Sequence, residues 1–173
     1  MSESVPDEEY LCTRIRRAEQ ALMGHHEAVL RGYGLTMTQY TVLLAISREG
    51  GMSGAQLARA AGVTQQTMAA VLSGLEGKHL ITRQPSPVHA KVMIAELTQP
   101  GRDVLNRAYQ EVNALERAFA GAFTSDEHSA LSSLLERATA ILIAQTPGTG
   151  PAGPAPGLLQ LIYSCVVTAL TSV

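Results

Sequence analysis

The sequence predicts a mainly α-helical chain with a small β-hairpin. Three observations lead to this fold class. Apolar residues recur at helical spacing over most of residues 8–145, and N-capping hydroxyl residues precede four of these segments. Only residues 80–97 look strand-like, because Pro85-Ser86-Pro87 interrupts them and no helix tolerates that sequence. The predicted order is therefore four helices, two strands and two more helices.

The first predicted helix spans about residues 8–32 and ends at Gly32-Tyr33-Gly34. It contains no proline, and its apolar residues are spaced for one buried face. The second runs from about Thr38 to Arg48. Thr36 and Gln39, three residues apart, form a capping-box pattern before it, and Gly50-Gly51 ends it.

Two short helices follow, separated by a tight turn. The third is predicted at Gly54–Ala61 after the Ser53/Gln56 capping pattern, and the fourth at about Gln65–His79 after the single cap Thr64. Gly62 supplies the backbone freedom that the turn between them needs. This pair of helices is a helix-turn-helix pattern.

The hairpin and two long helices complete the core of the chain. Strands are predicted at Leu80–Gln84 and Lys91–Leu97. Long helices are predicted at about 99–121 and 124–145, the second opened by Thr124 with Glu127.

Both ends of the chain differ in composition from this core. Residues 1–7 form an acidic arm, and residues 146–157 contain four Pro and four Gly, as a linker does. Residues 158–173 are uncharged, with eleven apolar residues, but fall short of the roughly 20 that a membrane span needs. We expect this segment to pack on its own protein or on a dimer mate. A membrane or partner anchor and a segment without function are the alternatives.

Composition excludes several classes of protein. The net charge of −2 and the 4% aromatic content are unlike a polybasic or base-stacking binder, so any DNA contact must come from a local patch. Two distant cysteines indicate neither a disulfide scaffold nor a zinc ribbon. No hydrolase or nucleotide-loop motif has its required context, so we expect no enzyme activity, cofactor or metal. The acidic N-terminus lacks a signal peptide, which predicts a cytoplasmic protein.

The helix-turn-helix pattern predicts contact with double-stranded DNA. Its second helix would present Gln65, Gln66 and Thr67 to base edges in the major groove, where glutamine pairs with adenine. Side chains around it would hold the phosphate backbone. These are Ser53, Thr64, Arg83, His89 and Lys91.

A series of motifs in unbroken order resembles the MarR family of bacterial transcription regulators, over roughly residues 8–145. They are Leu35-Thr36-x-x-Gln39-Tyr40-x-Val42-Leu43, Leu57-Ala58, Gly62-Val63-Thr64, Thr67-Met68, Leu75-Glu76, Leu80-Ile81-x-Arg83 and Leu97-Thr98-x-x-Gly101.

The resemblance implies a winged-helix homodimer. The helix-turn-helix would span about 53–79 and the wing about 80–98, and helices at about 8–32, 99–121 and 124–145 would form the dimer interface. It further implies a cytoplasmic repressor that small anionic or phenolic ligands, or thiol oxidation, release from a palindromic operator.

The sequence departs from the family pattern at the expected DNA contacts. His89 and Lys91 occupy the positions of an Asp-x-Arg pair in the wing, and Ala69 and Ala70 replace a polar residue and an Arg. Residues 53–98 carry a balance of only +2, which predicts weak or salt-sensitive DNA binding. The alternative is a MarR-like dimer that has lost DNA binding and serves as a protein-interaction or ligand-binding module.

Two further sites follow from the resemblance. Cys12 lies where the organic-hydroperoxide-sensing branch carries its reactive cysteine, although a small buried hydrophobe at the dimer seam is the simpler interpretation. A pocket for an aromatic or phenolic effector is expected between the dimer helices and the DNA-binding lobe. Its candidate residues are His25, His26, Tyr33, Met37 and Tyr40.

Overall fold

The computed structural model describes residues 10–89 and 91–145. Its elements, in chain order, are α1 (Leu11–Gly32), α2 (Met37–Glu49), β1 (Met52–Ser53), α3 (Gly54–Ala61), α4 (Gln65–Gly77), β2 (Ile81–Pro85), β3 (Met93–Leu97), α5 (Gln99–Ala122) and α6 (Ser125–Ala144). The mainly helical fold with a small antiparallel sheet is thereby confirmed.

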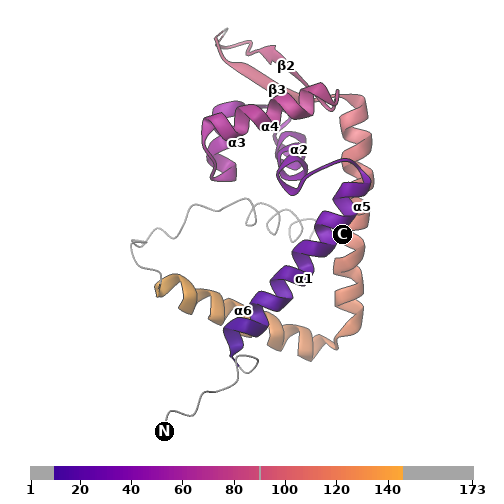
Figure 1. The fold of residues 1–173 in the computed structure, drawn as a ribbon, viewed down its shortest axis with the longest axis vertical. Helices are drawn as coiled ribbons and strands as arrows, with labels where there is room; N and C mark the ends of the chain where they lie inside the picture. Colours follow the sequence, from indigo (N-terminus) through magenta and orange to yellow (C-terminus); the bar gives the residue numbers. More distant parts are fainter. Residues whose placement is uncertain (1–9, 90, 146–173) are drawn as a thin grey trace.

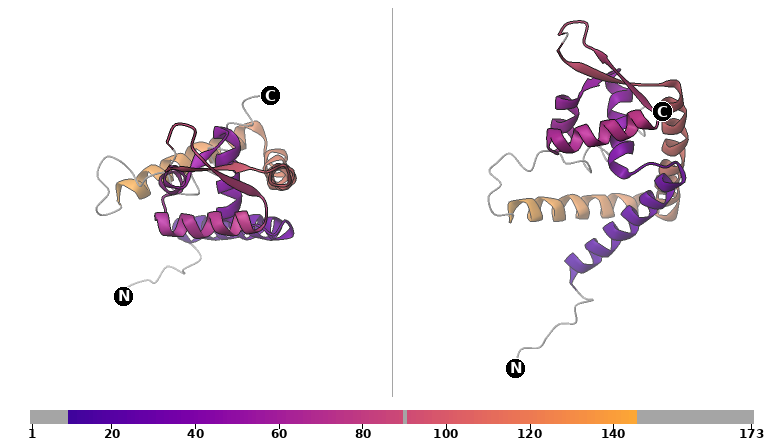
Figure 2. Two further views of the ribbon diagram at one scale, coloured as in Figure 1. Left: turned by 90° about the horizontal axis from the view of Figure 1, so that it is seen from above. Right: turned by 45° about the horizontal axis from the view of Figure 1, so that its top comes forward.

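The elements form a lobe with three long helices beside and below it. Helices α2, α3 and α4 pack together under the β2–β3 hairpin, which projects beyond them as a wing (Figure 1). Helix α5 runs from this lobe along α1 and α2, and α1 and α6 extend away from the lobe (Figure 2). The lobe therefore exposes the wing and α4 at the end opposite α6.

The sheet has three antiparallel strands in the order β1-β3-β2. In the hairpin, Ile81 lies opposite Leu97 and Pro85 opposite Met93. Sequence reasoning missed β1, whose two residues pair with Ile94 and Ala95 of β3. This strand exists only through that long-range pairing, so a local pattern cannot reveal it.

One apolar core holds α4 and the wing in position. Met68, Leu72 and Leu75 of α4 are buried in it, and Tyr40 of α2 is fully enclosed. Burying a Leu or Met side chain contributes about 1.5–3 kcal/mol each. The buried stripe therefore fixes which face of α4 points outward.

The N-cap predictions are confirmed. Thr36, Ser53 and Thr124 each accept a hydrogen bond from the backbone N–H three residues on, and each is part of a full capping box. Thr64 caps α4 through the backbone N–H of Thr67. These caps satisfy N–H groups that a helix otherwise leaves unpaired.

Several predicted boundaries were wrong by a few residues. Helix α4 ends at Gly77 rather than His79, because Lys78 is its C-cap and His79 has a left-handed φ of 59°. Strand β3 begins at Met93 rather than Lys91, since residues before Met93 form the wing turn. In the described chain, α1 begins at Leu11.

The acidic arm (1–7), the linker (146–157) and the apolar segment (158–173) lie outside the described residues. In the part that is described, we find no helix long and apolar enough to cross a membrane.

Candidate nucleic-acid interface

The turn between α3 and α4 gives the two helices a fixed relation. Gly62 adopts a left-handed φ of 64°, which favours glycine, and the Val63 N–H bonds the Ala58 carbonyl. Leu57, Ala58 and Ala61 of α3 are buried in the common core. This is the geometry of a helix-turn-helix.

The first turn of α4 is open to solvent. Gln65, Gln66 and Thr67 are all exposed, as their predicted role requires. The Thr67 hydroxyl lies 2.9 Å from that of Thr64, so it already has a local hydrogen-bond partner. The two glutamine amides are therefore the polar groups on this turn best suited to read a base edge.

The wing turn is organised by Ser86. Its hydroxyl accepts hydrogen bonds from the backbone N–H groups of Val88 and His89, and its own N–H bonds the Val92 carbonyl at 2.7 Å. His89 and Lys91 are exposed in this turn. Both side chains are thus available at the wing tip, where the sequence predicted them.

Arg83 of β2 is engaged with the recognition helix α4. Its Nε–H donates to Glu76 Oε2 at 2.9 Å, and its second guanidinium N–H also contacts that oxygen. Both side chains are about one-third exposed or more, so solvent screening keeps this pair weak, below about 1 kcal/mol. The pair ties the wing to α4, and it offsets part of the positive charge expected at the DNA.

Lys78 is the second cation held within the protein. Its ammonium donates to the Gly34 carbonyl at 2.6 Å and to Gln39 Oε1 at 2.8 Å. Sequence reasoning counted Lys78 among the local positive charges and missed this role, because its partners lie on the α1–α2 corner, about forty positions away. Lys78 therefore fixes the C-terminal end of α4 against that corner.

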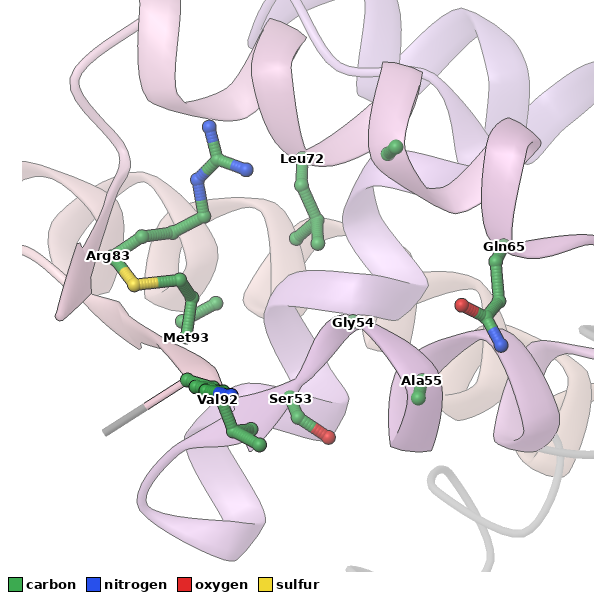
Figure 3. Close-up of a pocket in the computed structure, with 11 residues that line it drawn as sticks. Ser53, Gly54, Ala55, Gln65, Leu72, Arg83, Val92 and Met93 are labelled. Atoms are coloured by element: carbon green, nitrogen blue, oxygen red, sulfur yellow. The ribbon is translucent and has the colours of Figure 1, made fainter. Parts of the chain in front are cut away.

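A groove of about 410 Å³ brings several predicted residues together. Ser53 and Gln65 lie along one side of it, and Arg83 of β2 on the other (Figure 3). Lys91, Val92 and Met93 also line the groove on the wing side, and Ala69 and Leu72 line it from α4. The start of α3, one flank of α4 and the wing thus form one continuous surface.

The five candidate effector residues lie in different surroundings. His25 is exposed, whereas His26 and Tyr40 are buried. None of the five lines this groove or the second cavity, of about 200 Å³, between α2 and α5. The Tyr33 hydroxyl donates to Glu111 Oε1 at 2.5 Å, a contact that raises the pKa of Tyr33.

His26 is a buried polar group on α1. Its Nε2 has no hydrogen-bond partner among the described residues. Burial, and secondarily the neighbouring His25, lowers the pKa of His26 from 6.5, so the neutral imidazole is favoured. An unpaired buried nitrogen costs free energy, which makes this residue a candidate for contact with a further group.

The long helices outside the lobe leave apolar side chains uncovered in the single chain. Helix α6 buries none of its residues, and Leu131, Leu134, Leu135, Ile141 and Ile143 are exposed along it. Cys12, at the start of α1, is also exposed. A surface of this kind marks an interaction site.

The fold and this surface define a winged helix-turn-helix protein, a class that binds double-stranded DNA. A sequence profile of the MarR family matches residues 33–91. The repressor Rv2887 of Mycobacterium tuberculosis is 33% identical over 110 residues, which cover 64% of this chain and 79% of that protein. The chain therefore belongs to the MarR family of transcriptional regulators, whose members are not enzymes.

Solved structures agree with this membership. The Rv2887 crystal structure has a TM-score of 0.60 and 29% identity, covering 78% of this chain and 97% of its own. A mutant MarR of Escherichia coli complexed with operator DNA shares the fold, with a TM-score of 0.63 and 22% identity over 79% of this chain and 99% of its own. Bordetella bronchiseptica BpsR shares it with a TM-score of 0.63 and 21% identity over 79% of this chain and 98% of its own. The latter structure concerns regulation of DNA binding by 6-hydroxynicotinic acid.

Proposed function

We propose that the chain is a homodimeric repressor in the cytoplasm that binds a palindromic operator through α4 and the wing. The observation that carries this proposal is the exposed first turn of α4, with Gln65 beside a groove that Lys91 and Arg83 also line. A major groove accepts such a helix, and the adjacent phosphates accept such cations.

Each predicted contact has a proposed role. Gln65, Gln66 and Thr67 read bases. Thr64 and Ser53, as caps of α4 and α3, bring their helix ends to the phosphates, where helix N-termini favour anions. His89 and Lys91 contact the DNA backbone from the wing. Arg83 also contacts it, but more weakly, because Glu76 neutralises part of its charge.

The dimer is proposed to form through the helices outside the lobe. Residues 8–32, 99–121 and 124–145 supply the interface, with 53–79 as the helix-turn-helix and 80–98 as the wing. The exposed apolar side chains of α6 support this division, because a second copy would cover them. The arm, linker and apolar segment (1–7, 146–157 and 158–173) are proposed to be dispensable for DNA binding.

We propose that a small anionic or phenolic molecule releases the protein from DNA. Regulation of BpsR by 6-hydroxynicotinic acid supports the ligand class. The buried Nε2 of His26, which has no hydrogen-bond partner among the described residues, is the strongest candidate for a hydrogen bond to this molecule. The proposed contact residues are His25, His26, Tyr33, Met37 and Tyr40. Oxidation of the exposed Cys12 is the alternative signal.

One observation favours a second function, a dimer that binds a partner or ligand instead of DNA. Of the four cations between Ser53 and Thr98, Lys78 and Arg83 are engaged within the protein. The side chains of Arg59 and Lys91 make no hydrogen bond or ion pair within residues 10–89 and 91–145. In a dimer these two residues give only four such cations, a small electrostatic contribution to DNA binding, and this small number favours the partner- or ligand-binding function.

Gln66→Ala tests the proposed DNA reading. We expect it to lower the preference for the operator over random duplex by about 1–3 kcal/mol, while the dependence of affinity on salt stays unchanged. Competition binding by gel shift measures both. Ser47→Ala removes an exposed polar group on α2, outside the proposed DNA and dimer surfaces; it is the control and should bind as the unsubstituted protein does. An unchanged preference in Gln66→Ala would exclude this docking of α4.

A further inference from the structure

The outward face of α4 carries no charge. Successive residues of an α-helix are rotated by about 100°, so the side opposite buried Met68, Leu72 and Leu75 holds Gln66, Ala70, Ser73 and Gly77. All four are exposed. Ala69 is also exposed, on the flank that faces the groove beside the wing.

Cations that could reach bases from α4 are held elsewhere. The sole charged residue of the helix is Glu76, which pairs with Arg83. Lys78, just past the helix end, is bound to Gly34 and Gln39. Specific reading of guanine in the major groove most often uses an Arg or Lys on its O6 and N7 atoms. Helix α4 has no such group to offer.

The groups that remain suit A·T pairs. A glutamine amide can form paired hydrogen bonds with N6 and N7 of adenine, and an alanine methyl packs against the C5-methyl of thymine. We propose that α4 reads an A·T half-site, in which Ala70 and Ala69 contact thymine methyl groups and Gln66 contacts adenine. This inference rests on the proposed DNA binding and names the bases that the same surface prefers.

The first test is selection of bound duplexes from a random-sequence pool by the full-length protein. The inference predicts that the selected half-sites carry A·T pairs at the positions that α4 covers in the major groove. If the protein recovers no sequence above background, DNA binding itself is contradicted, and this inference with it. If the positions that α4 covers are G·C, DNA binding stands and the inference is overturned.

The second test separates methyl contact from DNA shape. Replacing a thymine by deoxyuridine removes the C5-methyl while keeping the base pair and its minor-groove edge. A buried methyl contributes about 0.8 kcal/mol, so each contacted thymine should cost about fourfold in affinity when replaced. The same replacement in the flanking DNA should have no effect. No loss at any half-site thymine would overturn the methyl contacts.

A variant then locates the contact on the protein. In Ala70→Gly the methyl partner is missing, so the deoxyuridine penalty at one thymine should disappear, whatever the change in overall affinity. Ala45→Gly, at a partly exposed position of α2 outside the proposed DNA and dimer surfaces, should keep the full penalty. An equal penalty in Ala70→Gly and the unsubstituted protein, at every thymine, would exclude Ala70 as the reader.

Discussion

At the scale of residues, the contact between Arg83 and Glu76 determines how much charge the wing can offer to DNA. The guanidinium is shared between a carboxylate of α4 and the groove that the wing lines. Removing the charge of Arg83 and removing the charge of Glu76 should therefore have opposite effects on DNA binding.

Arg83→Ala should weaken binding to all sequences and flatten the slope of log affinity against log salt by about one unit. Glu76→Gln keeps the side-chain size but releases the guanidinium, so it should raise affinity and steepen that slope. Fluorescence anisotropy over a range of salt concentrations measures both. Arg48→Ala, at an exposed position of α2 outside the proposed dimer helices, is the charge-matched control. If both Arg83 and Glu76 variants keep the original slope, Arg83 contacts no phosphate.

His26 should make stability depend on pH. Because burial lowers its pKa in the folded state, the unfolded chain binds the proton more readily, and the free energy of unfolding should fall as pH drops through 6.5. The stabilisation that comes from the neutral His26 is present in full above that pH. The free energy of unfolding stops falling once the pH is below the folded-state pKa of His26. His26→Leu should reduce this dependence at pH values below 6.5. Denaturant titrations measure it, with His79→Asn, at an exposed position outside α1, as control. Equal pH dependence in His26→Leu and the unsubstituted protein would contradict the assignment.

At the scale of elements, the junction between the wing and α5 depends on Gly101. The Thr98 N–H bonds the Leu80 carbonyl and the Thr98 hydroxyl bonds the His79 carbonyl, so the start of α5 lies directly against the end of the α4–β2 connection. A Cβ on Gly101 would overlap the Leu80 carbonyl, which is backbone and cannot move aside cheaply.

Gly101→Ala should destabilise the protein by at least about 1–3 kcal/mol, the usual cost of overpacking. Gly77→Ala, at the end of α4, meets open space and should be neutral or stabilising by up to about 1 kcal/mol. Thermal unfolding of the two variants provides the comparison. Equal melting temperatures would show that α5 can shift away from Leu80.

The same elements show what sequence reasoning could reach. Helix starts were predictable because each cap is a local pattern, as at Ser53 and Gln56. Strand β1 was missed, and so were the partners of Lys78 and Arg83, because each depends on residues that only the tertiary fold brings close. The exposed turn of α4 was predicted correctly, since its buried stripe follows from helical spacing.

At the scale of the whole molecule, the apolar surface of α6 is the feature that a single chain leaves unexplained. Leu134 is 53% exposed there. A charged side chain introduced into this surface should destabilise a dimer but leave the stability of a monomer unchanged. The oligomeric state can therefore be tested by substitution.

Leu134→Glu should convert the protein to monomers and weaken operator binding, because two half-sites need two lobes. Ser133→Glu, on the opposite side of α6, should leave the dimer intact. A chain ending at residue 145 should also remain dimeric and bind DNA with unchanged affinity. Analytical ultracentrifugation and anisotropy measure these properties. A dimeric Leu134→Glu protein would exclude this face as the interface, and loss of DNA binding on truncation would favour the partner-binding function.

The central claim is that α4 and the wing recognise a specific DNA sequence. Its most direct test is an anisotropy titration of the full-length protein against the best duplex recovered from fragments of its own genome, beside a scrambled duplex of equal composition. We predict a preference of about 10³ or more for the recovered duplex, with affinity falling steeply as salt rises. Equal affinity for both duplexes at every salt concentration would contradict it.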